Sequence, residues 1–134
     1  MFGALDISAS GLTAQRTRMD VIAANLANKD AIYDTQGHYA PYRRRSVEFA
    51  AGDPASGSGL GVHVQSIQKD PSPLHARYEP GSALADAQGN VYYPNVDATI
   101  ELVNALEASR AYEANITAAQ TTKQMIQSSL QLLA

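Results

Sequence analysis

Three residues in the middle of the chain belong to the types that build a hydrolase triad. Asp70, Ser72 and His75 supply a carboxylate, a hydroxyl and an imidazole within one short stretch. A serine nucleophile needs a base within hydrogen-bond reach, and that arrangement is defined by geometry rather than by sequence spacing. The sequence also shows no recognisable pair of carboxylates for glycoside cleavage. We therefore predict no catalytic residue and no enzymatic activity.

Patterns that bind metals or phosphates are equally weak. His38, His63 and His75 are isolated in the sequence, none has a second histidine four positions away, and the chain has no cysteine. Zinc ligands usually come at short, regular spacings. The glycine-rich stretch 57–61 lacks the lysine and the helix start of a phosphate-binding loop, so we interpret it as a linker. The sequence predicts no metal and no cofactor.

Three consecutive arginines, Arg43, Arg44 and Arg45, follow Tyr39 and Tyr42. Basic and aromatic residues in this order could bind nucleic acid or another anionic surface. The formal net charge of −3 favours a different interpretation: the arginines point to solvent or pair with acidic groups of a neighbouring subunit. We predict no nucleic-acid partner, and we expect inter-subunit polar contacts at these three positions.

The size and composition fit a single domain. The chain has 134 residues, no tryptophan and two phenylalanines, and a domain of this length can bury a core.

No run approaches the roughly 20 apolar residues of a membrane span. The opening residues lack a basic region followed by an apolar stretch. The sequence therefore predicts neither membrane insertion nor a cleavable secretory signal peptide.

Proline and glycine divide the chain into three segments. All six prolines and seven of the nine glycines lie between residues 31 and 95, and these residues interrupt regular structure. We predict a mainly α fold with a small β region: an N-terminal helix in 1–30, a β-hairpin and extended loops in 31–94, and a long C-terminal helix in 95–134. Asn95 or Asp97 can cap the second helix, whereas Asn25 and Asn28 fit a frayed end of the first.

The middle segment contains one clear hairpin pattern. Val47 and Phe49, then Val62 and Val64, alternate with other residues as half-buried strands do. The stretch 51–59 between them is rich in glycine and serine and is interpreted as a flexible loop. A second turn is predicted at 88–90, and the proline-containing stretch 70–73 should be extended or turned rather than helical.

Both end helices carry an apolar stripe whose positions advance alternately by four and three residues, which is typical of helices that meet along a seam. As helices, residues 3–28 would span about 39 Å and the C-terminal segment about 55 Å, so the second stripe outruns the first. An intramolecular hairpin, acting as a soluble monomeric adaptor, is the alternative; the mismatch favours a subunit that assembles with neighbours. The predicted interface residues are Leu5, Leu12, Met19, Ile22, Leu26, Leu102, Val103, Tyr112, Ile116, Ile126, Leu130 and Leu133.

The stretches 4–16 and 18–28 resemble the opening of the bacterial flagellar basal-body rod proteins, and in particular the FlgC-type proximal rod proteins. Tyr92–Asp97, Glu101–Val103 and Ala108–Asn115 are similar to the C-terminal signature of the same family. Between them, Tyr42–Arg44 and Asp70–Pro73 also match. The chain departs from the family pattern at Ala31 and at 82–84.

The resemblance implies a structural subunit of the proximal rod, in the periplasmic shaft that transmits torque. It implies that the two end helices pair as a coiled coil in the inner core of the rod, as in other axial proteins. The implied partners are other copies of the chain, other proximal and distal rod proteins, the protein that joins the rod to the membrane ring, and the flagellar type III export apparatus. Export by that route requires no cleavable signal peptide.

Overall fold

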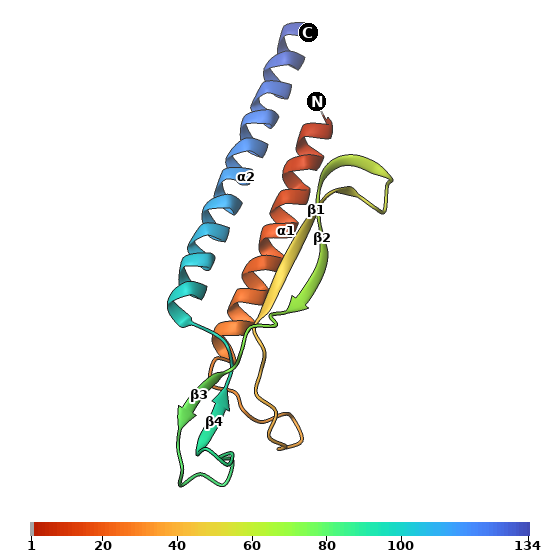
Figure 1. Cartoon of the computed structure of the whole chain (residues 1–134). Coiled ribbons are helices and arrows are strands. Elements are labelled where there is room, and N and C mark those ends of the chain that lie inside the picture. The colour runs from red at the N-terminus through yellow and green to blue at the C-terminus, as the bar shows by residue number, and fades with distance from the viewer. Residues whose placement is uncertain (1) are drawn as a thin grey trace.

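The computed structural model describes residues 2–134, so Met1 of the predicted N-terminal segment lies outside the described residues. The elements follow in the order α1 (Phe2–Ala27), β1 (Arg45–Asp53), β2 (Ser58–Lys69), β3 (His75–Tyr78), β4 (Asn90–Tyr93) and α2 (Ala98–Leu133). Along the sequence, a long helix precedes and another follows two small hairpins; one hairpin lies beside α1 and the other lies below the helices (Figure 1). The prediction of a mainly α fold with a small β region is confirmed.

The two helices run antiparallel and side by side (Figure 1). The space for a Cβ atom at Gly11 is filled by the Asn115 side chain, whose Nδ2 would lie 2.9 Å away. Near the middle of α1, Arg18 forms an ion pair of 3.5 Å with Glu107. Helix α1 has 26 residues and α2 has 36, so α2 continues beyond the start of α1 (Figure 1).

The helix ends follow from local hydrogen bonds. Asp97 caps α2, because its Oδ1 accepts from the amides of Thr99 at 2.8 Å and Ile100 at 3.2 Å. Of the two predicted caps the structure therefore uses Asp97. Helix α1 ends where the amide and side chain of Asn28 both donate to the Ala24 carbonyl, at 3.1 and 2.8 Å. Asn25 does not belong to a frayed end as predicted, since it is fully buried.

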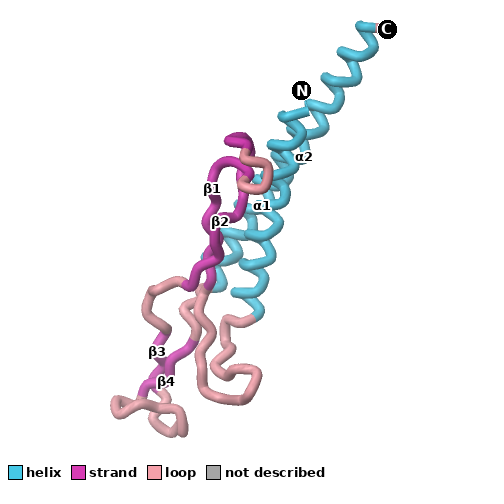
Figure 2. Tube along the Cα trace, turned by 90° about the vertical axis from the view of Figure 1, so that its right-hand side faces the viewer, coloured by secondary structure: helices cyan, strands magenta, loops and turns pink. Residues whose placement is uncertain are grey.

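The β1–β2 hairpin lies along α1, so that α1 is the middle layer between the hairpin and α2 (Figure 2). The strands pair antiparallel, with Val47 opposite Ile67 and Phe49 opposite Val64. The loop predicted at 51–59 is shorter than expected: 51–53 belong to β1, and 58 and 59 belong to β2. Cross-strand pairing continues this far because a bulge at Ala51–Asp53 adjusts the register.

The hairpin comes close to α1 at Gly61. This residue has a φ of +87°, and a Cβ atom there would lie 2.7 Å from the Ser10 Oγ, so glycine is favoured both by backbone conformation and by space. The Val62 amide donates to the same Ser10 Oγ at 3.1 Å. This contact fixes the hairpin against the N-terminal half of α1.

The second hairpin, β3–β4, lies beyond the base of the helix pair (Figure 1). The predicted turn at 88–90 leads directly into β4, and its strand partner β3 was not predicted. Val91 of β4 is buried, as are Pro94 and Val96 just after it. Other buried apolar residues are Ala14, Ile22 and Ala108 on the helices. The core is therefore thin and follows the seam and the base of the helix pair.

Candidate assembly interface

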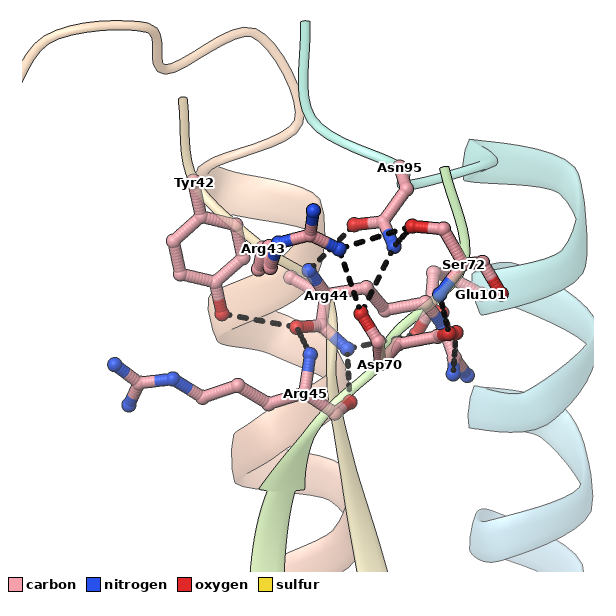
Figure 3. Close-up of polar contacts among 9 residues, drawn as sticks. Tyr42, Arg43, Arg44, Arg45, Asp70, Ser72, Asn95 and Glu101 are labelled. Atoms are coloured by element: carbon pink, nitrogen blue, oxygen red, sulfur yellow. Dashed lines mark hydrogen bonds and ion pairs between the residues drawn. The ribbon is translucent and has the colours of Figure 1, made fainter. Parts of the chain in front are cut away.

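A cluster of polar side chains occupies the base of the helix pair, where an apolar core would be expected (Figure 3). Asn25 of α1 and Glu101 of α2 are both 0% exposed. Burial of a charged carboxylate is costly unless it is paired and hydrogen-bonded. We call this cluster the polar junction; its members are Asn25, Tyr42, Arg43, Arg44, Asp70, Ser72, Asn95 and Glu101.

Arg44 provides the charge that Glu101 needs. Its Nε donates to the Glu101 Oε1, and its Nη1 lies 3.4 Å from the Asp70 Oδ2. The Asn25 Nδ2 donates to the other Glu101 oxygen at 3.3 Å. The first turn of α2, the last turns of α1 and the segment before β1 are thereby joined through one buried carboxylate.

Asn25 also determines where the chain returns to α1. Its Oδ1 accepts from the Tyr42 hydroxyl at 2.9 Å and from the Arg45 amide at 3.0 Å, while its Nδ2 donates to the Arg45 carbonyl at 2.8 Å. The side chain therefore pairs with the Arg45 backbone much as a neighbouring strand would. This holds the start of β1 against the end of α1.

The proline-containing stretch 70–73, which bends at Ser72, is held by Arg43 and Asn95. Both side chains donate to the carbonyls of Asp70 and Ser72, Arg43 at 3.0 and 2.9 Å and Asn95 at 3.3 and 3.1 Å. The Asn95 Oδ1 in turn accepts from the Arg44 amide at 2.8 Å. Backbone groups that the prolines leave without a sheet partner are thus satisfied by side chains.

Hydrogen bonds and burial shift two pKa values in the junction. The pKa of the Asp70 carboxyl lies below its ordinary value, because the Ser72 hydroxyl and amide donate to it and Arg44 adds positive charge. The pKa of the Tyr42 hydroxyl is raised, chiefly because burial disfavours the phenolate. At neutral pH Asp70 is therefore ionised and Tyr42 is a neutral donor, as their contacts require.

The structure places the three predicted arginines differently. Arg43 and Arg44 bind groups within the chain, an intramolecular role that the sequence interpretation did not include. Arg45 is exposed, with its guanidinium 5.8 Å from the centre of the Tyr42 ring. Arg45 is therefore the arginine of the three whose side chain is free to face a neighbour.

Asp70, Ser72 and His75 are not arranged as a catalytic triad. Ser72 donates its amide to Asp70, and His75 lies on the exposed strand β3. Among residues 2–134 no group of three or more histidine, aspartate or glutamate side chains is placed to hold a metal ion. An open cleft of about 600 Å³ lies between α1 and the β1–β2 hairpin, with His63 at its edge; the His63 Nδ1 contacts the Gly52 carbonyl at 2.8 Å.

Large apolar side chains are exposed in two places on α2. The first, which we call the outer face, consists of Ile100, Leu102, Val103 and Leu106, each more than half exposed. The second lies in the extension, residues 125–133, where Leu132 and Leu133 are 88% and 85% exposed. Apolar surface of this kind marks sites of association between proteins.

The predicted interface residues fall into three groups by exposure. Ile22 is buried against the rest of the chain. Half-buried positions are Leu5, Leu12, Met19, Leu26, Tyr112, Ile116 and Ile126. Exposed positions, at 60–85%, are Leu102, Val103, Leu130 and Leu133.

Sequence reasoning missed the exposed apolar residues Ile100, Leu106, Met125 and Leu132. They lie off the stripe that advances by four and three, and their apolar type alone could have identified them. The seam also differs from the predicted stripe near the start of α2. Glu101 and Ala108 are buried there, and Leu102 points away.

In the described part of the chain, no helix is long and apolar enough to cross a membrane. Residues 5–31 match the sequence model of the family described as "Flagella basal body rod protein". Residues 87–132 match the one described as "Flagellar basal body rod FlgEFG protein C-terminal".

Curated relatives match nearly the whole chain. The flagellar basal-body rod protein FlgC of Yersinia enterocolitica is 44% identical over 128 residues, which cover 95% of this chain and 93% of that protein. The FlgC protein of Bacillus subtilis is 41% identical over 145 residues, covering 98% and 97%. That of Borreliella burgdorferi is 39% identical over 150 residues, covering 99% and 97%. Taken with the paired end helices, these matches show that the chain belongs to the FlgC-type family of flagellar basal-body rod proteins.

Proposed function

We propose that the chain is a structural subunit of the proximal flagellar rod in the periplasm, and that its role is mechanical rather than enzymatic. The observation that carries the proposal is the apolar surface that the single chain leaves uncovered on α2. Such surface is stable when other proteins cover it. Membership of a rod family supplies the class of protein that does so.

The mechanism follows from the number and kind of helix contacts. Each subunit buries its remaining apolar side chains against other copies and against other proximal and distal rod proteins, and many such contacts together resist twisting. Contacts between different surfaces of successive subunits can continue without closing, which gives a helical shaft. The polar junction fixes the angle between the helix pair and the hairpins, so torque on one is passed to the other.

The further partners we propose are the protein that joins the rod to the membrane ring and the flagellar type III export apparatus. Export in an unfolded state suits a chain whose end helices gain much of their apolar burial on assembly. The entropy cost of ordering the helices is then offset by contacts made in the rod.

The proposal is tested by incorporation into basal bodies. Ile116 lies half-buried on α2, whereas Ala118 two positions away is exposed. We expect Ile116→Asp to be lost from purified basal bodies and to abolish swimming, because a carboxylate in a helix seam is desolvated without a partner. Ala118→Asp is the matched control and should enter rods. Entry of both variants at the level of the unmodified chain would contradict the placement of Ile116 in a helix seam on which rod assembly depends.

A further inference from the structure

The β3–β4 hairpin turns alternate backbone groups out of its two edges. The Glu79 amide donates to the Gly89 carbonyl at 2.8 Å, so these two residues form a hydrogen-bonded pair. Bonded and non-bonded pairs alternate along antiparallel strands. Tyr78 and Ala76 therefore belong to non-bonded pairs, and their N–H and C=O groups point away from β4. The two residues of β4 opposite them likewise point away from β3.

The outward groups of β4 are all satisfied within the chain. The Tyr92 amide donates to the Tyr39 Oη at 3.0 Å, and the Tyr39 hydroxyl donates to the Tyr92 carbonyl at 2.9 Å. The Asn90 amide donates to the Asp86 Oδ1 at 2.9 Å, and its carbonyl accepts from the Asp86 amide at 2.9 Å. This edge of the hairpin is therefore closed to a further strand.

The outward groups of β3 are open. Within residues 2–134, no hydrogen bond is made by the outward N–H and C=O groups of Ala76 and Tyr78, and all four residues of β3 are exposed. Strand β3 borders the hairpin on the side away from the loop that joins α1 to β1 (Figure 1). An open row of alternating donors and acceptors is a site to which an extended chain can add a strand.

The side chain between the two open residues adds a requirement of charge. The Arg77 guanidinium lies 4.0 Å from the centre of the Tyr93 ring, and its Nη2 lies 3.4 Å from the Asp30 Oδ1. The Lys29 Nζ lies 3.3 Å from the other oxygen of the same carboxylate. These four residues line part of a pocket of about 270 Å³, whose other acid, Asp97, accepts from amides at the start of α2. Two cations thus share one carboxylate, and a second carboxylate beside Arg77 would be attracted.

No strand of a second copy, within the described residues 2–134, meets both requirements. Self-pairing of β3 through all four open groups would set Arg77 directly opposite Arg77, and like charges in that position are destabilising. The β4 edge is closed, and β2 carries no acidic residue. The acids of β1, Glu48 and Asp53, already accept hydrogen bonds within their own hairpin.

We infer that the open edge of β3 binds an extended segment of a different protein, which adds a third strand and places an aspartate or glutamate opposite Arg77. This inference rests on the proposed function as an assembling subunit, and it assigns one partner contact to backbone hydrogen bonds. Ala76 and Tyr78 each offer one donor and one acceptor to the added strand. The carboxylate of the partner then reaches the pocket beside Arg77 and Lys29.

Photocrosslinking in intact cells tests the contact. Tyr78 is 74% exposed on the open edge, so we expect a chain with Tyr78→p-benzoylphenylalanine to form an adduct with a different protein on irradiation. Adding Ala76→Pro, which removes one outward N–H, should lower the adduct yield about tenfold. Ala76→Thr is the matched control, because it keeps the N–H and suits a strand. The inference is overturned by the absence of an adduct, by an adduct of two copies of this chain, or by equal yields from the proline and threonine variants.

A second pair of variants leaves the backbone unchanged and tests the charge. Adding Arg77→Gln should lower the adduct yield about fivefold, whereas Arg77→Lys should lower it less, because lysine keeps the positive charge. Equal yields from Arg77→Gln and from the chain with Arg77 retained would overturn the assignment of an acidic residue to the partner. This pair also decides the case in which Ala76→Pro does not fold, as judged by circular dichroism of the purified chain.

Basal bodies purified from the irradiated cells separate this contact from the rod function. An adduct found in basal bodies supports both. Chain present in basal bodies without an adduct overturns the contact at β3 and leaves the rod function standing. An adduct in cells whose basal bodies lack the chain supports the contact and overturns the rod function.

Discussion

Replacing Arg44 by methionine tests whether the polar junction depends on a neutralised buried charge. The substitution keeps an aliphatic side chain but removes the donor to Glu101, whose side chain is 0% exposed. The carboxylate is left with the Asn25 amide at 3.3 Å as its remaining bond. Stranding one partner of a buried ion pair costs about 3–5 kcal/mol when both are fully buried.

The expected cost here is somewhat smaller. The Arg44 side chain is 22% exposed, so water reaches part of the site and we expect a loss of about 2–4 kcal/mol in the free energy of unfolding. Urea unfolding followed by far-ultraviolet circular dichroism should show a midpoint lowered by roughly 1–3 M.

Two further variants make the result decisive. Arg44→Met/Glu101→Met removes both charges and should recover most of the lost stability, because an apolar pair of similar volume replaces the ion pair without a stranded charge. Arg45→Met is the matched control at the next position; its side chain is exposed, so the change should stay within about 0.5 kcal/mol. Equal stability of the single and double variants would refute the reasoning, because the carboxylate would then not be the source of the loss.

Three other predictions use the same urea assay. Asp70→Asn should lower the free energy of unfolding at pH 7, and this loss should disappear in acid. The folded-state pKa of Asp70 lies below its ordinary value of 3.8, so the stabilisation by its carboxylate is complete above 3.8 and is lost as the pH falls through the folded-state pKa. A loss of stability that is unchanged at pH 2 would contradict this. Gly11→Val should lower the free energy of unfolding by about 1–3 kcal/mol, because the new Cβ would lie 2.9 Å from the Asn115 Nδ2. Gly3→Val is the control, because nothing lies within 4 Å of a Cβ at that position. Equal effects of the two substitutions would argue against close packing of the helices at Gly11. Asp97→Ala should cost about 1 kcal/mol and Asp97→Ser much less, since serine also caps; equal losses would mean that the cap is not what stabilises α2.

The sequence by itself determined the two helices. Helical hydrogen bonds join residues four apart, so the confinement of all six prolines and seven of the nine glycines to the middle of the chain was enough to predict a helix on either side of it. The excess length of α2 could be predicted for the same reason. The first hairpin followed from the alternation around Val47 and Val62, because side chains of a strand alternate between its faces.

The tertiary structure decided the polar junction. Glu101 is buried against Arg44 and Asn25, which lie 57 and 76 positions away in the sequence. A local sequence pattern cannot predict contacts between residues so far apart. A glutamate among apolar residues of a helix is usually assigned to the solvent face, since burial is unfavourable unless remote groups compensate for the charge. The rotation of α2 that points Leu102 outward depends on this burial. The polar contacts at the base of the helix pair therefore determine which apolar residues of α2 stay exposed for assembly.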